Sequence, residues 1–187
     1  MKKALHRNGL VAQFSVAIQI VVMLFYPALA LAGPGDGEVV GGSAQISPDH
    51  LTVDQASDKA IINWNGFNIN PEELFRVNQP GAESVLLSRD VSGDASNILG
   101  SLVANGKVFI VNPNGVVFGR DSKIDVAGIL ATTFNVGNDD FMNGNLEFAQ
   151  DPSAQLSAII NQGEIRVSEN GFVFLVAPAV SNEGLII

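Results

Sequence analysis

The run from Asn105 to Gly119 constrains the fold of this chain more than any other stretch. Two short apolar segments, 108–111 and 116–118, consist of Val, Ile and Phe, which are typical of β-strands. The break between them, residues 112–115, reads Asn-Pro-Asn-Gly and has β-turn composition, because proline presets φ at the second position and glycine accepts a positive φ. The run predicts a strand, a tight corner and a second strand. A hairpin with Asn-Gly at its tip is the alternative.

The same scheme recurs along the chain, which favours a coil over a hairpin. Residues 161–167 read Asn-Gln-Gly-Glu-Ile-Arg-Val, residues 168–174 again place a glycine before an apolar run, and residues 182–186 open the scheme once more. Five glycines recur about every 16 to 22 residues, the spacing of a solenoid repeat: Gly106, Gly128, Gly144, Gly163 and Gly184. We predict an all-β parallel β-helix, with a β-sandwich or meander as the alternative. One circuit of the coil, here called a rung, would take about 21 residues and allow about seven rungs.

The first 32 residues have the pattern of a cleaved signal peptide. Basic residues stand at positions 2, 3 and 7, a largely apolar run follows from Phe14 to Leu31, and Ala30-Leu31-Ala32 supplies the small-x-small cleavage pattern. We predict cleavage between Ala32 and Gly33, export from the cytoplasm by the Sec machinery, and one domain from 33 to 187. A retained membrane anchor is the alternative.

The charge balance after residue 32 excludes some partners. Seven Lys and Arg residues stand against 19 acids, which gives a net charge of −12. Nucleic-acid binding needs clustered basic residues and is not expected. No second apolar span of about 20 residues follows, so we expect no stable membrane span after cleavage. The chain has no cysteine, and its stability must come from burial without disulfides.

Local patterns predict the N-terminal elements. Residues 33–42 are rich in glycine and fit a flexible lead-in or a first strand. Residues 43–58 contain a turn at 47–49 and four candidates for inward positions: Ala44, Ile46, Leu51 and Val53. Residues 59–69 are predicted as a strand, in which Trp64 is expected to pack in the core or cap rather than to bind a sugar.

Two segments have the pattern of short helices. Residues 70–79 begin Asn-Pro-Glu-Glu, with an N-cap residue, a proline at the first helical position and acids in the first turn. Residues 95–102 place Ile98, Leu99 and Leu102 at helical spacing. We expect both helices to decorate the solenoid. Residues 138–150 are predicted as a loop, and strands are predicted at 84–87, 116–118, 123–126, 128–134, 156–160, 163–167 and 172–176.

Residues with catalytic or metal-binding chemistry do not gather in any motif. His50 is the one histidine after residue 32, which argues against a site built from nitrogen or sulfur ligands. Asp139-Asp140 lacks the spaced acids of a calcium loop, and no glycine-rich phosphate loop opens a helix. A β-helical carbohydrate enzyme would need converging carboxylates, whereas the acids here are scattered. We predict no metal, no cofactor and no enzymatic activity.

Two motifs carry a resemblance to a known family. The segment 62–69, Ile-Asn-Trp-Asn-Gly-Phe-Asn-Ile, and the corner 112–115 followed by Val-Val-Phe-Gly occur in the order found in the N-terminal secretion domain of the filamentous haemagglutinin family. These domains belong to the exported partner in two-partner secretion. The first motif resembles the high-molecular-weight adhesin branch, and the resemblance covers about residues 36 to 187.

The resemblance implies a right-handed, single-stranded parallel β-helix with a cap over its N-terminal end. It implies passage through the periplasm to the cell surface or medium of a Gram-negative bacterium. The partner would be an outer-membrane β-barrel transporter of the Omp85/TpsB type, which binds the chain through its periplasmic domains, and folding outside would nucleate the solenoid. The residues that the family assigns to export correspond to Asn63, Asn65, Gly66, Phe67, Asn68, Ile69, Asn112, Pro113, Asn114 and Gly115.

Alternatives remain open for the motifs and for the function. The motif residues could be corner residues needed for folding rather than for recognition, because turn geometry alone accounts for Pro113 and Gly115. The domain could also be the N-terminal part of a surface adhesin with its own binding activity, or a β-helical carbohydrate enzyme. The chain ends at Ile187 inside a predicted strand, which suggests a fragment, a truncated frame or a stand-alone domain.

Overall fold

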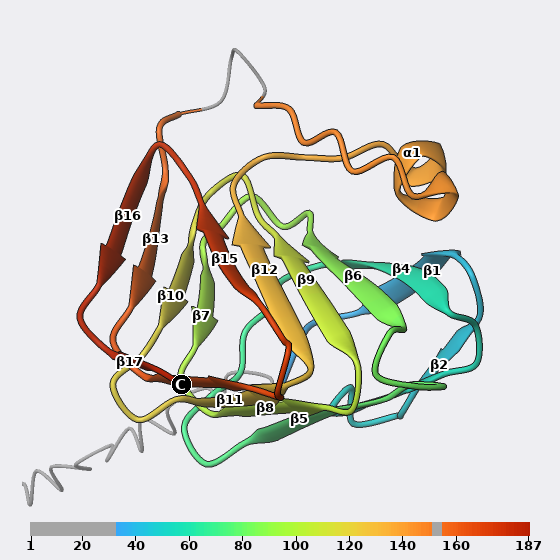
Figure 1. Ribbon diagram of the computed structural model, residues 1–187, viewed down its shortest axis with the longest axis horizontal. Helices are drawn as coiled ribbons and strands as arrows, with labels where there is room; N and C mark the ends of the chain where they lie inside the picture. The colour runs from blue at the N-terminus through green and yellow to red at the C-terminus, as the bar shows by residue number, and fades with distance from the viewer. Residues whose placement is uncertain (1–32, 151–154) are drawn as a thin grey trace, which may run out of the picture.

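The computed structural model describes residues 33–150 and 155–187, so the predicted signal peptide, including Ala32, lies outside the described residues. The described chain contains 17 strands and one helix and winds into a three-sided coil (Figure 1). In chain order the elements are β1 (Gly37–Gly41), β2 (Ala44–Ile46), β3 (Thr52–Gln55), β4 (Lys59–Trp64), β5 (Leu74–Asn78), β6 (Val85–Asp90), β7 (Ser96–Ile98), β8 (Ser101–Ala104), β9 (Lys107–Val111), β10 (Val116–Phe118), β11 (Lys123–Val126), β12 (Gly128–Thr132), α1 (Asn138–Asn143), β13 (Ala158–Asn161), β14 (Glu164–Val167), β15 (Val173–Val176), β16 (Ala179–Asn182) and β17 (Leu185–Ile186).

Each side of the coil is one sheet. Sheet A has the strand order β1-β4-β6-β9-β12-β15, sheet B has β17-β14-β11-β8-β5-β3-β2, and sheet C has β16-β13-β10-β7. The pairings of β1 with β4 and of β2 with β3 are antiparallel, and the other pairings of these strands are parallel. The chain runs through sheets B, A and C in turn and advances toward the viewer with each circuit (Figure 1). The predicted right-handed parallel β-helix is confirmed.

The register shows how regularly the rungs stack. Val85 in β6 pairs with Lys107 in β9, and Lys107 pairs with Gly128 in β12, spacings of 22 and 21 residues. Each side chain therefore lies directly over its equivalent in the previous rung, about 4.8 Å away. Stacking buries one continuous apolar interior, as in other repeat structures.

The corner at 112–115 confirms the prediction of strand, corner, strand. β9 before it belongs to sheet A, and β10 after it belongs to sheet C. The two strands pair with the rungs above and below and not with each other. A hairpin is therefore excluded, although the four residues do form a turn closed by the hydrogen bond from Gly115 N to Asn112 O, 3.0 Å.

The coil has five rungs rather than about seven, as the five parallel strands β4, β6, β9, β12 and β15 of sheet A show. Ile129 in β12 pairs with Val173 in β15, 44 residues further on. The chain leaves the coil after β12 and returns at β13, and residues before β3 form a cap. The predicted number was wrong because both segments were counted as rungs.

The two predicted helices were wrong, since strands occupy both segments. Residues 74–78 form β5, in which Phe75 and Val77 are buried and their neighbours are exposed. Glu72 has φ 69°, a left-handed conformation that a helix cannot contain. Residues 96–98 and 101–104 form β7 and β8, again with alternating burial. The period of two, set by stacking on neighbouring rungs, prevailed over the local helical spacing.

The one helix of the described chain lies where a loop was predicted. α1 spans Asn138–Asn143, and its single buried residue is Phe141. Gly144 follows with φ 85° and donates from its backbone to the carbonyls of Asp140 and Phe141, a left-handed C-cap. Gly144 is therefore a helix terminator, and its assignment to the solenoid repeat was wrong.

A cap covers the N-terminal end of the coil, as the resemblance implied. β1 and β2 run antiparallel to β4 and β3 of the first rung. A side chain on Gly37 in β1 would meet the ring of Trp64 at 2.6 Å, so glycine lets the strand lie directly on the indole. Trp64 has no solvent exposure, which confirms the prediction that it packs in the core or cap. Among the inward candidates Val53 is fully buried, and Ala44, Ile46 and Leu51 are half-buried.

The outer side of sheet A carries a second apolar cluster, which the segment after β12 covers. Phe141 of α1 and Phe148 lie against Phe109 of β9, with ring centroids 6.0 and 6.4 Å apart. The Lys59 ammonium in β4 donates to the carbonyls of Phe141 and Met142 at 3.2 and 3.0 Å. The segment thus reaches back along the coil from the fourth rung to the first.

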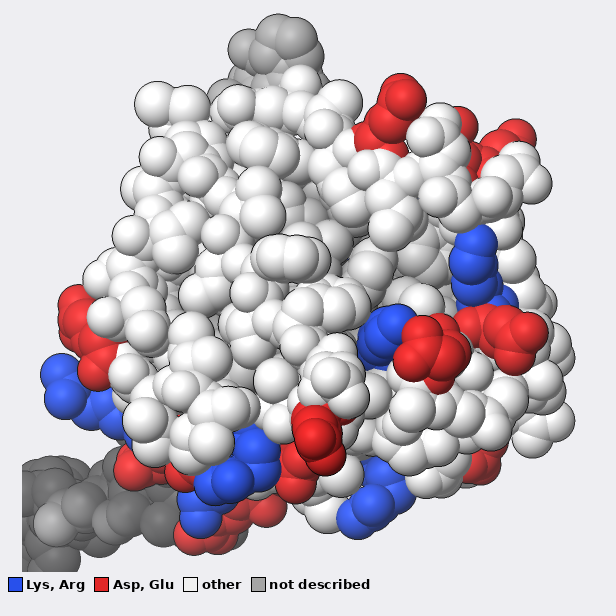
Figure 2. Space-filling view, in the orientation of Figure 1, with Lys and Arg blue, Asp and Glu red and all other residues white. Residues whose placement is uncertain are grey.

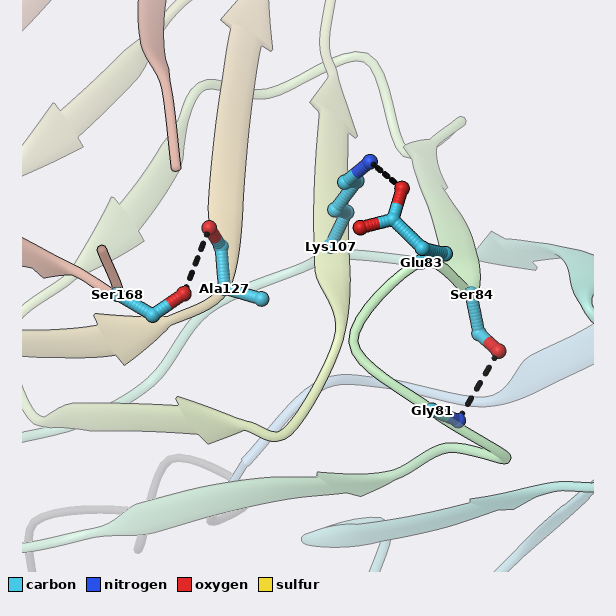
Figure 3. A network of polar contacts seen from close by, with 6 residues as sticks. All are labelled: Gly81, Glu83, Ser84, Lys107, Ala127 and Ser168. Atoms are coloured by element: carbon cyan, nitrogen blue, oxygen red, sulfur yellow. Dashed lines mark hydrogen bonds and ion pairs between the residues drawn. The ribbon is translucent and has the colours of Figure 1, made fainter. Parts of the chain in front are cut away.

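The corners between sheets B and A are held by short polar contacts (Figure 3). Gly81 N donates to Ser84 Oγ at 3.2 Å, and Ser168 Oγ donates to the Ala127 carbonyl at 3.3 Å, which ties one rung to another. Lys107 and Glu83 form an ion pair of 2.7 Å. The Glu83 side chain is 90% exposed, and such a pair contributes little to stability.

Candidate recognition site at the corners between sheets A and C

The first motif, 63–69, begins at the end of β4 and turns the chain out of sheet A. Gly66 has φ 102°, which glycine adopts without strain. Phe67 and Ile69 are fully buried. Phe67 packs against Phe75 with ring centroids 5.3 Å apart, and Ile69 forms a parallel bridge with Ile98 of the next rung. These three residues build the first corner from within.

The asparagines of the first motif lie in different surroundings. Asn63 Oδ1 accepts a hydrogen bond from Arg89 Nη1 at 3.1 Å, and Asn68 Oδ1 accepts from the backbone N of Asn97 at 2.8 Å. Both therefore fix neighbouring strands. Asn65 is exposed. Its backbone N donates to Asp36 O at 2.9 Å, and its side chain forms no hydrogen bond within the described residues.

The second motif, 112–115, is organised by one buried side chain. Asn112 has no solvent exposure. Its Oδ1 accepts from Asn114 N at 2.8 Å, an Asx-turn, and its Nδ2 donates to Ser96 Oγ at 2.8 Å and to Asp94 O at 2.9 Å. Gly115 has φ 106°, and a side chain there would meet the Ala158 carbonyl at 2.7 Å. The motif needs these residue types to turn the chain and to accept the next rung.

The two motifs lie on the same edge of the coil, two rungs apart, and Asp90 connects them. Asp90 pairs in register with Trp64, at the start of the first corner. Its Oδ2 accepts from Phe67 N at 2.7 Å and from Ser96 Oγ at 2.8 Å, and Ser96 Oγ accepts from Asn112 Nδ2. One polar chain, Phe67–Asp90–Ser96–Asn112, thus joins both motifs through the intervening rung.

Asp90 is a buried carboxylate held by neutral donors. It is 3% exposed, and its Oδ1 accepts from both the backbone N and Oγ of Ser92, at 2.9 and 2.7 Å. Within the described ranges it forms no ion pair. Four donors aimed at one carboxylate satisfy its lone pairs, and this makes burial of the charge tolerable.

Arg89, the residue before Asp90, faces the outer side of sheet A. Its guanidinium donates to Asn135 Oδ1 at 2.9 Å, Asn138 Oδ1 at 2.8 Å and Val136 O at 2.7 Å, besides Asn63. Burial lowers the pKa of the Arg89 guanidinium, which stays protonated because arginine is not deprotonated in proteins. Arg89 therefore fastens the segment after β12 to the first motif.

The ten predicted motif residues therefore form one region but have unequal exposure. The structure brings both motifs to the same edge of the coil and connects them through the hydrogen bonds of Asp90 and Ser96. Asn65 and Asn114 are exposed and Pro113 is half-buried, whereas Phe67, Ile69, Asn112 and Gly115 are buried. Gly33, the other predicted site residue in the described chain, lies beside the first corner, where its backbone N donates to Glu73 Oε2 at 2.8 Å.

Sequence reasoning missed Asp90 and Ser96. Ser96 lies in the segment 95–102, for which the spacing of apolar residues predicts a helix, and no sequence motif includes Asp90. A usable signal existed, because Asp90 precedes Asn112 by 22 residues, which is the length of one rung in this part of the coil. A polar residue at the position equivalent to a motif asparagine is a candidate for the same corner.

Neither a cluster of metal ligands nor a membrane-spanning helix occurs in the described chain. Within residues 33–150 and 155–187, no group of three or more His, Asp or Glu side chains is placed to hold a metal ion. In the same residues no helix has the length and apolar character needed to cross a membrane. His50 is partly exposed, with Nδ1 3.2 Å from the Pro34 carbonyl.

Comparison with known proteins agrees with this geometry. Residues 36–187 match the family model of the TPS secretion domain. The heme/hemopexin-binding protein of Haemophilus influenzae (strain ATCC 51907 / DSM 11121 / KW20 / Rd) is 34% identical over 181 residues, 90% of this chain and 20% of that protein. A second heme/hemopexin-binding protein of Haemophilus influenzae is 46% identical over 85 residues, 46% of this chain and 9% of the relative.

A solved structure has the same fold. The crystal structure of the HMW1 secretion domain from Haemophilus influenzae superposes with a TM-score of 0.78 at 35% sequence identity, over 82% of this chain and 42% of that one. The chain therefore spans about a fifth of the length of the first relative and less than half of the solved structure.

Proposed function

Because this chain belongs to the TPS secretion domain family, we propose different roles in export for the buried and the exposed residues of its two motifs. It is the secretion domain of a two-partner secretion exoprotein. Domains of this family are secreted across the outer membrane of Gram-negative bacteria with a TpsB transporter as partner. The proposal concerns how this chain's residues serve that transport.

The buried motif residues build the coil, and the exposed ones are available to the transporter. The observation that carries this division is the polar chain from Phe67 through Asp90 and Ser96 to Asn112. Removing the Asn112 amide leaves donors and acceptors unpaired inside the coil, at a cost of about 1–3 kcal/mol. Asn114 is exposed, and its side chain forms no hydrogen bond within the described residues. A requirement for that side chain in export therefore points to recognition.

Export of the extended chain precedes folding in this proposal. The signal peptide is removed between Ala32 and Gly33, the transporter's periplasmic domains bind strand-forming segments of the unfolded chain, and the capped end emerges first. Strand addition suits such binding, because main-chain hydrogen bonds give affinity and alternate side chains give specificity. Each rung that forms outside covers the previous one and opposes return.

The test compares two single substitutions. Asn112→Ala and Asn114→Ala are each expressed with a TpsB transporter that exports the unsubstituted chain, and each purified protein is refolded in vitro. We expect Asn112→Ala to impair refolding and secretion together, and Asn114→Ala to refold normally while secretion falls. Gln155→Ala, an exposed amide outside both motifs, is the control and should change neither.

Two outcomes would contradict the division. Normal secretion of Asn114→Ala would remove the recognition role of the exposed residue. Normal refolding of Asn112→Ala with lost secretion would show that the buried residue is itself recognised, in the extended chain. Secretion is measured as the fraction of protein in the medium relative to the periplasm, and refolding is followed by circular dichroism.

In this proposal, any binding activity of the whole exoprotein lies outside this domain, and the domain itself has no catalytic role. The relatives are named for binding heme or hemopexin, and the chain matches 20% of the first of them. A heme titration followed by absorbance should give no specific spectral shift with the chain from Gly33 to Ile187. A shift that saturates at one equivalent would place a binding function in this domain.

A further inference from the structure

Gly33, the residue that cleavage would leave at the N-terminus, is already docked against an acid. Its backbone N donates to Glu73 Oε2 at 2.8 Å, across 40 residues of sequence. Glu73 lies in the turn that leads into β5, directly after the first motif. The inference developed here rests on the proposed cleavage between Ala32 and Gly33.

The Glu73 carboxylate is held in place by neutral groups. Oε2 also accepts from Asn70 N at 2.8 Å, and Oε1 accepts from Asn70 Nδ2 at 3.1 Å. The Glu73 carbonyl accepts from Ser101 N at 2.8 Å, which fixes the turn to β8 of the third rung. No Lys, Arg or His side chain of the described residues forms an ion pair with Glu73. The carboxylate is therefore positioned, partly buried and without a cation.

The chain around Gly33 fits this position closely. Gly33 has φ 81°, and a side chain there would meet Leu51 Cδ2 at 2.7 Å. Gly35 N donates to Gly66 O at 2.7 Å, so the next residues continue along the first corner. The nearest acid along the chain, Asp36, lies 3.9 Å from His50 Nε2. Glu73 is thus the acid that faces the Gly33 nitrogen.

We infer that Glu73 is the binding site for the α-ammonium group that signal cleavage creates on Gly33. Hydrolysis adds water across the Ala32–Gly33 amide: the carboxylate leaves on the released segment, and the amine remains on Gly33 and takes up a proton. One neutral N–H donor becomes an ammonium facing a carboxylate, so cleavage adds the attraction between two opposite charges to a hydrogen bond that the carboxylate already strengthens. Processing therefore tightens the capped end of the coil.

The experiment is a double-mutant cycle on the mature chain, Gly33 to Ile187. The chain is prepared with a free amine or with an acetylated N-terminus, in the unsubstituted form and as Glu73→Gln, and Tm is measured for all four. Acetylation should lower Tm by about 2–4 °C in the unsubstituted chain, as expected for roughly 1 kcal/mol in a chain of this size, and by less than about 1 °C in Glu73→Gln. Glu72→Gln, which neutralises the neighbouring exposed acid, should leave the acetylation effect unchanged.

Equal effects of acetylation in the unsubstituted and Glu73→Gln chains would overturn the inference. If Glu73→Gln does not fold, the unsubstituted chain decides alone: an ion pair weakens in 1 M salt, whereas a steric effect of the acetyl group does not. An acetylation effect that is the same at low and high salt therefore also counts against the inference. The mass of the exported protein tests the cleavage position separately, so the two failures are distinguishable.

Discussion

At the N-terminal end of the coil, β1 and β2 lie across the first rung and leave Trp64 with no solvent exposure. At the other end, Val180 and Ile186 pair in register with Ile159 and Ile165, which are fully buried one rung earlier. Val180 and Ile186 are nevertheless 48% and 41% exposed. The part of the surface over β15 and β16 carries few charged side chains; charged side chains lie along the lower edge of the view and on its right-hand side, away from these strands (Figure 2).

Positions in register along the coil therefore share the strand conformation, but they differ in whether a further layer of residues shields their side chains from water. A rung acquires its register from the rung before it, but its side chains leave water only when another layer is added. The cap supplies that layer at the start of the coil. From the cap on the first rung we infer that the coil grows from its capped end. Four predictions test the contrast in cover within residues 33–187.

The largest loss of stability is expected at the capped end. Trp64→Ala removes a fully buried indole that contacts Phe67 and Phe75, with ring centroids 5.7 and 5.9 Å away. The free energy of unfolding should fall by about 3–5 kcal/mol, measured by urea denaturation. Trp64→Phe, which also removes an indole N–H without a hydrogen-bond partner in the described chain, should lose less. If both variants lost the same free energy of unfolding, the volume of the buried ring would not account for the stability of the capped end.

Whether a following rung stabilises a side chain is tested most directly at two positions that pair in register, Ile159 and Val180. Ile159→Ala should lower the free energy of unfolding by about 2–4 kcal/mol, because it leaves a cavity between covered rungs. Val180→Ala, at the position paired with Ile159, should cost roughly 1 kcal/mol or less, because Val180 is 48% exposed and less apolar surface leaves water there. Both are measured by urea denaturation, and similar losses would mean that the last rung is covered in solution.

A smaller effect is expected from the polar chain between the motifs. Asp90→Ala strands the Phe67 amide and the Ser96 hydroxyl, and we expect a loss of about 2 kcal/mol. Asp94→Ala is the matched control, because its side chain is exposed and only its carbonyl accepts a hydrogen bond from Asn112. Thermal unfolding of both variants checks the prediction. A stable Asp90→Ala protein would show that packing alone holds the two corners.

The smallest change in stability is expected from Val180→Asp at the open end, within about 0.5 kcal/mol. Its effect should appear in association, because β15, β16 and β17 are the outer strands of their sheets and uncovered edges pair with other chains. Light scattering at high concentration should show self-association of the unsubstituted chain and less of it for Val180→Asp. A strictly monomeric unsubstituted chain would contradict this.

The sequence was most informative where backbone geometry restricts the residue type. Gly115 and Pro113 predicted the corner, and the recurring glycines with the family resemblance predicted the coil. Residues 70–79 misled because an N-cap, a proline and two acids are a local pattern, whereas β5 is imposed by pairing with β3 and β8. Asp90 was missed because its donor Phe67 N comes from the previous rung and Asn112, which continues the same chain of hydrogen bonds through Ser96, comes from the next. The stacking register brings these three rungs together.

Pulse-labelled hydrogen exchange during refolding measures directly whether the coil grows from its capped end. The chain from Gly33 to Ile187 is refolded from denaturant and labelled at increasing times. Backbone amides of β4 to β7 should be protected first, followed by those of β9 to β12, with β14 to β17 last and weakest. Protection that appears first in β13 to β17, or at the same time in every rung, would contradict growth from the cap.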